Sequence, residues 1–153
     1  MSPYTLCAFL FGVITGLRTF TGVAAISWAV RLGWFHPRAA WLAFLGYAAT
    51  PWIASAMAVG ELIADKLPNT PSRKAPLGFI ARILIGAFCG AVLGSMGDVL
   101  ASGVAAGIAG ALAGTFGGYE ARVRLAKAVG KDLPIALLED VIAVGGAFFL
   151  ITK

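Results

Sequence analysis

The sequence predicts an all-α integral membrane protein with about five transmembrane helices. Its 153 residues are 59% hydrophobic and only 12% charged, whereas a soluble domain carries roughly 25% charged residues. The apolar residues also lie in long runs, and about 20 such residues cross a hydrocarbon core of about 30 Å. We therefore expect a single transmembrane domain over residues 1–153, with almost nothing outside the bilayer.

The first two predicted spans each contain an interruption. The first covers residues 4–30 and holds Arg18 near its middle, where an arginine costs at least about 2.5 to 3.5 kcal/mol on insertion scales. The second covers residues 41–64 and contains Pro51, which we expect to kink the helix.

Three further runs complete the predicted bundle. Residues 77–97 follow a proline-rich loop, and residues 99–119 follow a tight turn at Asp98. A basic segment, expected to be helical at the membrane surface, then leads to residues 134–152. Pro134 suits the first turn of that last helix.

A weak repeat relates the hairpin of the second and third spans to that of the fourth and fifth. Glu61 and Arg82 flank Pro76 in the first hairpin, as Glu120 and Asp140 flank Pro134 in the second. Both copies would cross the membrane in the same direction, as in a parallel repeat. Coincidence between Gly/Ala-rich helices is the alternative.

Basic residues alternate between loops and predict the orientation. Two loops hold Lys66, Arg73, Lys74, Arg122, Arg124, Lys127 and Lys131, whereas a loop on the other side holds Arg31 and Arg38. The positive-inside rule then predicts a multi-pass protein of a bacterial inner membrane, with a cytoplasmic N-terminus and an external C-terminus. Because the net charge of +5 is explained in this way, we expect no nucleic-acid partner.

Several ionisable side chains within the apolar runs are candidates for a substrate or ion path. Arg18 is expected to face the bundle interior, beside the hydroxyls of Thr15, Thr19 and Thr21 and with Glu61 as the nearest acid. Snorkelling to the surface or a structural ion pair would also explain Arg18. The full candidate set is Arg18, Glu61, Asp65, Lys66, Arg82, Glu120, Glu139 and Asp140.

The acids of this set are expected to find partners. Glu61 and Asp65 stand one helical turn apart, so we expect them to share a proton, a cation or a base such as Lys66. A solvated helix end is the alternative. Arg82 is expected to pair with Glu139 and Asp140 at the same depth, and Glu120 to lie in a similar layer.

We predict no catalytic residue, metal site or cofactor. His36 falls on the opposite side of the membrane from the acids, and Cys7 and Cys89 lie inside apolar runs, where a thiol behaves as a small hydrophobe. Two glycine stripes predict close helix packing, within one hairpin or in a homodimer. They comprise Gly86, Gly90 and Gly94, and Gly110, Gly114 and Gly118.

Three motifs resemble an uncharacterised membrane family, domain of unknown function 4126. They are Gly16-Leu17-Arg18, Glu61-Leu62-Ile63-Ala64-Asp65-Lys66-Leu67-Pro68, and Arg82 followed by Gly86-Ala87. The resemblance covers most of the chain and implies a multi-spanning membrane protein, but no reaction. Many members carry further acids after that proline, whereas this chain reads Asn69-Thr70-Pro71-Ser72-Arg73.

The leading hypothesis is a small transporter or channel-like protein in which Arg18, Glu61, Asp65 and Arg82 line a polar path for a small ion or lipid. The first alternative is a membrane-embedded enzyme that handles a lipid or polyprenyl phosphate at the cytoplasmic face. The second is a non-catalytic scaffold or binding subunit. Since no motif of a phosphate-handling enzyme or a Ser/His/Asp hydrolase is present, a non-enzyme is favoured.

Overall fold

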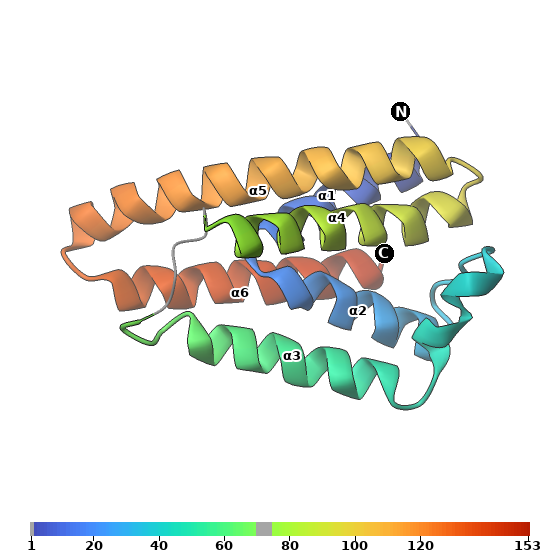
Figure 1. Cartoon of the computed structure of the whole chain (residues 1–153), viewed down its shortest axis with the longest axis horizontal. Helices are drawn as coiled ribbons and strands as arrows, with labels where there is room; N and C mark the ends of the chain where they lie inside the picture. Colours follow the sequence, from blue (N-terminus) through green and yellow to red (C-terminus); the bar gives the residue numbers. More distant parts are fainter. Residues whose placement is uncertain (1, 70–74) are drawn as a thin grey trace.

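The computed structural model describes residues 2–69 and 75–153, and the regular elements there are helices (Figure 1). In chain order they are α1 (Pro3–Leu17), α2 (Thr19–Arg31), the 3-10 helix η1 (Ala40–Gly46), α3 (Thr50–Ala64), α4 (Pro76–Met96), α5 (Leu100–Val129) and α6 (Asp132–Ile151). Helices α4, α5 and α6 are long and apolar enough to cross a membrane, and η1 with α3 makes a fourth, bent candidate. The all-α class is confirmed, whereas the count of about five spans is not.

The predicted first span, residues 4–30, is instead two short helices that fold back on each other. They meet at Arg18, whose backbone is extended, with φ −140° and ψ 111°. Tyr4, near the start of α1, lines the same cavity as Trp34 and Phe35, which follow α2, so the chain enters and leaves at one end (Figure 1).

Each helix of this hairpin is shorter than a membrane span. At 1.5 Å per residue, α1 and α2 are roughly 22 and 20 Å long, whereas the hydrocarbon core is about 30 Å thick. Extended backbone at membrane depth is tolerated where protein surrounds it, and Arg18 is buried. Arg18 therefore lies at the tip of a hairpin and not in the middle of a span.

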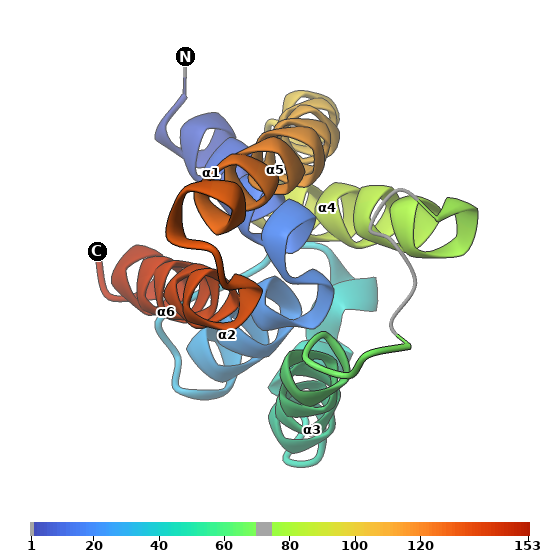
Figure 2. The same cartoon turned by 90° about the vertical axis from the view of Figure 1, so that its left-hand side faces the viewer.

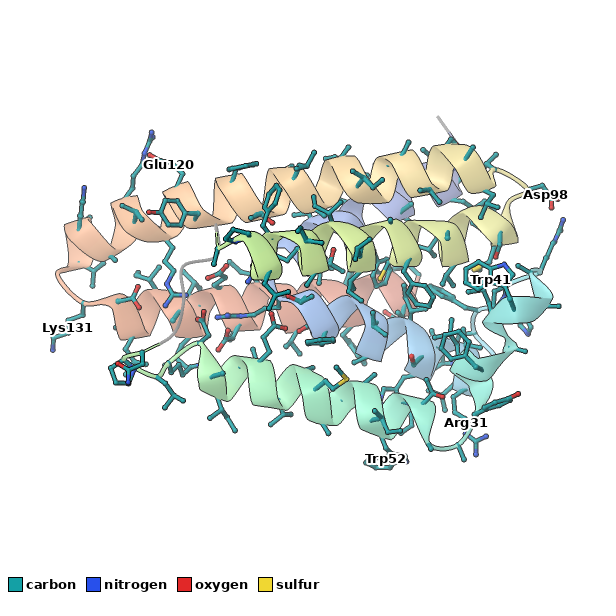
Figure 3. All side chains as sticks on the ribbon, viewed as in Figure 1. Arg31, Trp41, Trp52, Asp98, Glu120 and Lys131 are labelled. Carbon is teal, nitrogen blue, oxygen red and sulfur yellow. The ribbon has the colours of Figure 1, made fainter. Side chains whose placement is uncertain are left out.

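The hairpin also changes the position of the termini. Pro3 lines one cavity with Thr152 and Lys153, so both ends of the described chain lie together. Arg31 and Asp98 lie at this end of the bundle, and Lys131 lies at the other (Figure 3). The prediction that the termini are on opposite sides is wrong, because the first apolar run turns back.

The predicted second span is broken before Pro51 and not kinked at it. The chain bends by 72° between η1 and α3. Pro51 lies in the first turn of α3, where the N–H that proline lacks would have no acceptor within the helix.

The last three helices follow the prediction more closely. Helices α4 and α6 begin and end within two residues of the expected limits. Helix α5 differs, because it continues for 30 residues through Arg122 and Lys127. The basic segment is therefore the last part of α5, which ends at Gly130 in the left-handed conformation with φ 76°.

Glycines of both stripes pack inside the chain, namely Gly86, Gly90, Gly94, Gly110 and Gly114. A Cβ on Gly90 would overlap the carbonyl oxygen of Gly103, and one on Gly107 would overlap that of Gly86, so the backbones of α4 and α5 touch. A Cβ on Gly114 would overlap the carbonyl oxygen of Val13 in α1. Helices α1, α4 and α5 therefore form one closely packed group, seen end-on in Figure 2.

Helix α2 joins this group to α3, whereas α6 packs directly on α1, α2 and α5 (Figure 2). It packs against α3 through Ala24, Ala54 and Ala58. Towards the termini, an apolar cluster of fully buried side chains joins α1, α2, η1 and α4. It includes Phe11, Ile26, Leu42, Leu45 and Val92.

The charge repeat is not matched by equivalent packing. In the second hairpin α5 packs on α6, whereas in the first α3 packs on α2 and α4 packs on α1 and α5. Glu61 accepts hydrogen bonds from the backbone of α2, but its counterpart Glu120 pairs with Arg124 on an exposed surface.

Candidate functional site

Arg18 is the centre of a buried layer of charges at the hairpin tip. Its side chain is 1% exposed, and its Nη2 lies 2.8 Å from Oδ2 of Asp65, at the end of α3. Its Nε donates to Oδ1 of Asp140 in α6 at 2.7 Å. The prediction that Arg18 faces the interior and meets an acid is confirmed. The prediction that this acid is Glu61 is wrong.

Glu61 binds backbone and not a base. Its Oε1 accepts the N–H of Thr19 at 2.8 Å, and its Oε2 accepts the N–H of Phe20 at 3.0 Å. These are the first amides of α2, which lack partners within the helix and carry the positive end of its dipole. Because Arg18 at the N-cap position has no side-chain oxygen, Glu61 of α3 caps α2 from a neighbouring helix.

Asp65 and Asp140 each bind two bases. Asp65 Oδ2 accepts from Arg18 and, at 2.6 Å, from Nη1 of Arg122 in α5. Asp140 binds Arg18 and also Lys66, whose Nζ donates to its Oδ2. Glu61 and Asp65 therefore have separate partners, and the expectation that they share one is wrong, because the amides of α2 satisfy Glu61.

Arg122 belongs to the layer, although the candidate set predicted from the sequence omitted it. Its Nε and Nη2 donate to Asp132 at 2.9 and 2.6 Å, and its Nη1 lies 3.8 Å from Oε2 of Glu139. The basic composition around Arg122 suggested a surface segment, and the continuation of α5 brings this one side chain inward. The spacing of Arg122 and Asp132 on either side of a turn is the signal that indicates their pairing.

The remaining candidates differ in position. Arg82 and Glu139 are both buried. Glu120 lies outside the layer, since its side chain is 54% exposed and pairs with Arg124, and Figure 3 shows it pointing away from the bundle. The Thr15 hydroxyl donates to its own helix, at Gly12 O, and not into a cavity with Arg18.

Exposure in the layer increases from its centre outwards. Arg18 is almost fully buried, whereas Asp65 and Asp140 are 12%, Arg122 16% and Lys66 24% exposed. Arg122 pairs with Asp132, next to Lys131, so the layer extends towards that end of the bundle, while the apolar cluster around Phe11 and Leu42 lies nearer the termini. Within residues 2–69 and 75–153, no group of three or more His, Cys, Asp or Glu side chains is placed to hold a metal ion.

Comparison with known proteins identifies a family without a described activity. No curated protein and no solved structure matches the chain. The family described as Domain of unknown function (DUF4126) matches residues 6–153. Since this match covers nearly the whole sequence, the chain is a member of the DUF4126 family.

Proposed function

We propose that this protein is a small membrane transporter or channel-like protein whose ion-handling site is the charge layer at the hairpin tip. The observation that carries the proposal is the burial of Arg18 at that tip, between carboxylates from α3 and α6. Discontinuous helices with charged or polar tips are a common way for transporters to build sites within the membrane.

The energetics of the layer support function more than stability. Taking ions out of water costs several kcal/mol each, and apolar packing of similar volume is often as stable as a buried ion pair. Ionisable groups inside membrane bundles are therefore functional candidates. A contribution to folding alone therefore does not account for a layer that joins α3, α5, α6 and the hairpin through charges.

The sharing of each carboxylate supports movement within the layer. Asp65 binds both Arg18 and Arg122, and Asp140 binds both Arg18 and Lys66. If Arg18 moves away from either acid, that acid keeps a second base. An entering cation or proton can thus replace one base without leaving a buried carboxylate unpaired, which lowers the cost of rearrangement.

The asymmetry of access supports a gated path. The layer extends through Arg122 and Asp132 towards the Lys131 end and is partly exposed, and an apolar cluster lies on its other side, nearer the termini. By the positive-inside rule, we place the Lys131 end in the cytoplasm, and both termini then lie outside. This state would be open to the cytoplasm and closed to the exterior.

Flux measurements in proteoliposomes test the proposal. Vesicles that hold a trapped pH indicator receive a K⁺ diffusion potential, and H⁺ flux is compared with that of protein-free vesicles; K⁺ and Cl⁻ fluxes follow with matching indicators. We expect flux of at least one of these ions above the protein-free rate. Asp140→Asn should reduce it by roughly tenfold or more, the effect of losing a charge-assisted hydrogen bond.

The matched control is Glu120→Gln, which removes an exposed acid outside the layer. It should leave the flux unchanged. If wild-type vesicles conduct none of the three ions faster than protein-free vesicles, or if both variants reduce the flux equally, the charge layer is not an ion-handling site.

A further inference from the structure

An apolar groove separate from the charge layer runs between α2, α3 and α6. Its volume is about 450 Å³, within the range of roughly 300 to 1,000 Å³ typical of ligand sites. From Thr21 to Leu32 it follows α2 for roughly 16 Å, at 1.5 Å per residue. Its walls include Ala25 and Trp28 from α2, Val59 and Leu62 from α3, and Val144 and Phe148 from α6.

One buried hydroxyl in this wall has no protein partner. Thr21 lines the groove and is 6% exposed, and among residues 2–69 and 75–153 its Oγ1 has no hydrogen-bond partner. The other hydroxyl of the wall is satisfied, since Ser55 Oγ accepts from Trp28 Nε1 at 3.0 Å. Because buried polar groups are normally bonded, Thr21 indicates a ligand with a hydrogen-bonding atom at this depth.

A positive charge lies just beyond the end of the groove beside Thr21, on Lys66, which does not itself line the groove. Leu62 lines this end, and Lys66 lies one turn further along, with its Nζ donating to the Leu62 carbonyl at 2.9 Å. Lys66 is the most exposed base of the charge layer, at 24%. A molecule in the groove would therefore meet apolar side chains along its length, then a hydroxyl, then an ammonium group.

We infer that the groove binds one anionic membrane phospholipid. One acyl chain lies along α2, α3 and α6, an ester carbonyl accepts the Thr21 hydroxyl, and the phosphate lies at Lys66. The apolar wall is unsuited to a hydrated ion, and the lysine favours an anionic over a zwitterionic headgroup. Because the phosphate competes with Asp140 for Lys66, lipid binding would act on the charge layer; the inference itself requires no transport activity.

Fluorescence quenching by brominated lipids tests this site. The reporter is Trp28, in a chain in which Trp34, Trp41 and Trp52 are changed to Phe. Quenching by brominated phosphatidylglycerol in phosphatidylcholine bilayers is compared with quenching by brominated phosphatidylcholine in phosphatidylglycerol bilayers. The relative affinities of the two lipids follow from the two quenching curves. We expect phosphatidylglycerol to be preferred by about fivefold, the effect of one basic residue near the membrane surface.

Variants separate the parts of the site. Lys66→Met should abolish the preference, whereas Thr21→Val should weaken quenching by both lipids equally, because both carry ester carbonyls. Val144→Phe fills the groove and should reduce quenching. Val141→Phe, on an exposed part of the same helix outside the groove, is its control and should not.

Equal quenching by the two lipids in the parent chain would overturn the anionic assignment. If Thr21→Val and Val144→Phe both leave the quenching unchanged, the lipid does not occupy the groove. That result would also overturn the proposal. If Lys66→Met fails to fold, as judged by thermal unfolding in detergent, the parent's lipid preference together with the Val144 and Val141 variants decides the question.

Discussion

The two halves of the bundle are held together by different means. In the half made of α1, α4 and α5, glycines bring helix backbones into direct contact, as at Gly90 and Gly103. In the half made of α2, α3 and α6, alanine contacts lie beside an open groove, and carboxylates bridge the helices at one end. Backbone contacts allow few alternative arrangements, whereas shared ion pairs allow several. We call the first half the frame, and we propose that the second half is the part that can move.

The largest effect is expected from a side chain placed between the helices of the frame. Gly107→Ala puts a Cβ against the carbonyl oxygen of Gly86 and 3.0 Å from Gly90 Cα. Overpacking usually costs about 1–3 kcal/mol, and because backbone must move here we expect about 4 kcal/mol of lost stability. Equilibrium unfolding in mixed detergent micelles measures this difference.

Gly117→Ala on the same helix is the matched control. Nothing lies within 4 Å of a Cβ at Gly117. Alanine is the better helix former by about 1 kcal/mol, so this change should leave stability unchanged or raise it. Equal losses from the two substitutions would show that the glycine contacts do not form the frame.

A smaller loss is expected in the other half, from Arg18→Met. Removing one partner of a buried ion pair typically costs about 3–5 kcal/mol. Asp65 and Asp140 retain Arg122 and Lys66, so we expect about 2–3 kcal/mol, near or below the low end of that range. The same unfolding measurement checks it, and Arg124→Met, which breaks an exposed pair, should cost less than about 1 kcal/mol.

A loss of stability above about 5 kcal/mol for Arg18→Met would contradict the conclusion that the half made of α2, α3 and α6 has alternative ion pairs. It would mean that the remaining bases do not compensate the acids. The layer would then be a rigid structural element and not one with alternative pairings.

The sequence predicts the frame better than the layer. Long apolar runs between prolines and glycines locate α4 and α6, and the cost of a buried arginine predicts that Arg18 faces inward. Hydropathy does not distinguish one span over residues 4–30 from two short helices, because both bury the same apolar residues. The turn depends on tertiary partners, namely the acids that bind Arg18 and the carboxylate that caps α2.

The partners of the acids show a second limit of sequence reasoning. Matching charges by depth assigned Glu61 to Arg18, but Glu61 binds the amides of Thr19 and Phe20. Backbone N–H groups become available only where a helix starts, and the start of α2 is not apparent from composition. Arg122 was missed for a related reason, since its inward position depends on the continuation of α5 beyond the expected end of the span.

The smallest effect is expected where Glu61 meets the start of α2, and Glu61→Gln isolates the charge in that contact. Glutamine keeps the size of the side chain and one oxygen that can accept from Thr19 or Phe20, but it loses the negative charge at the positive end of the helix. Carboxylates at helix N-termini contribute about 0.3–1 kcal/mol when exposed and up to about 2 kcal/mol when partly buried. Because Glu61 is half-buried, we expect a loss of about 1 kcal/mol in the same unfolding assay.

Glu120→Gln, on an exposed helix surface, should change stability by less than about 0.5 kcal/mol. If the two variants are equally stable, the start of α2 does not depend on a carboxylate, and α2 is held to α3 by the contacts among Ala24, Ala54 and Ala58 and by the Trp28–Ser55 hydrogen bond.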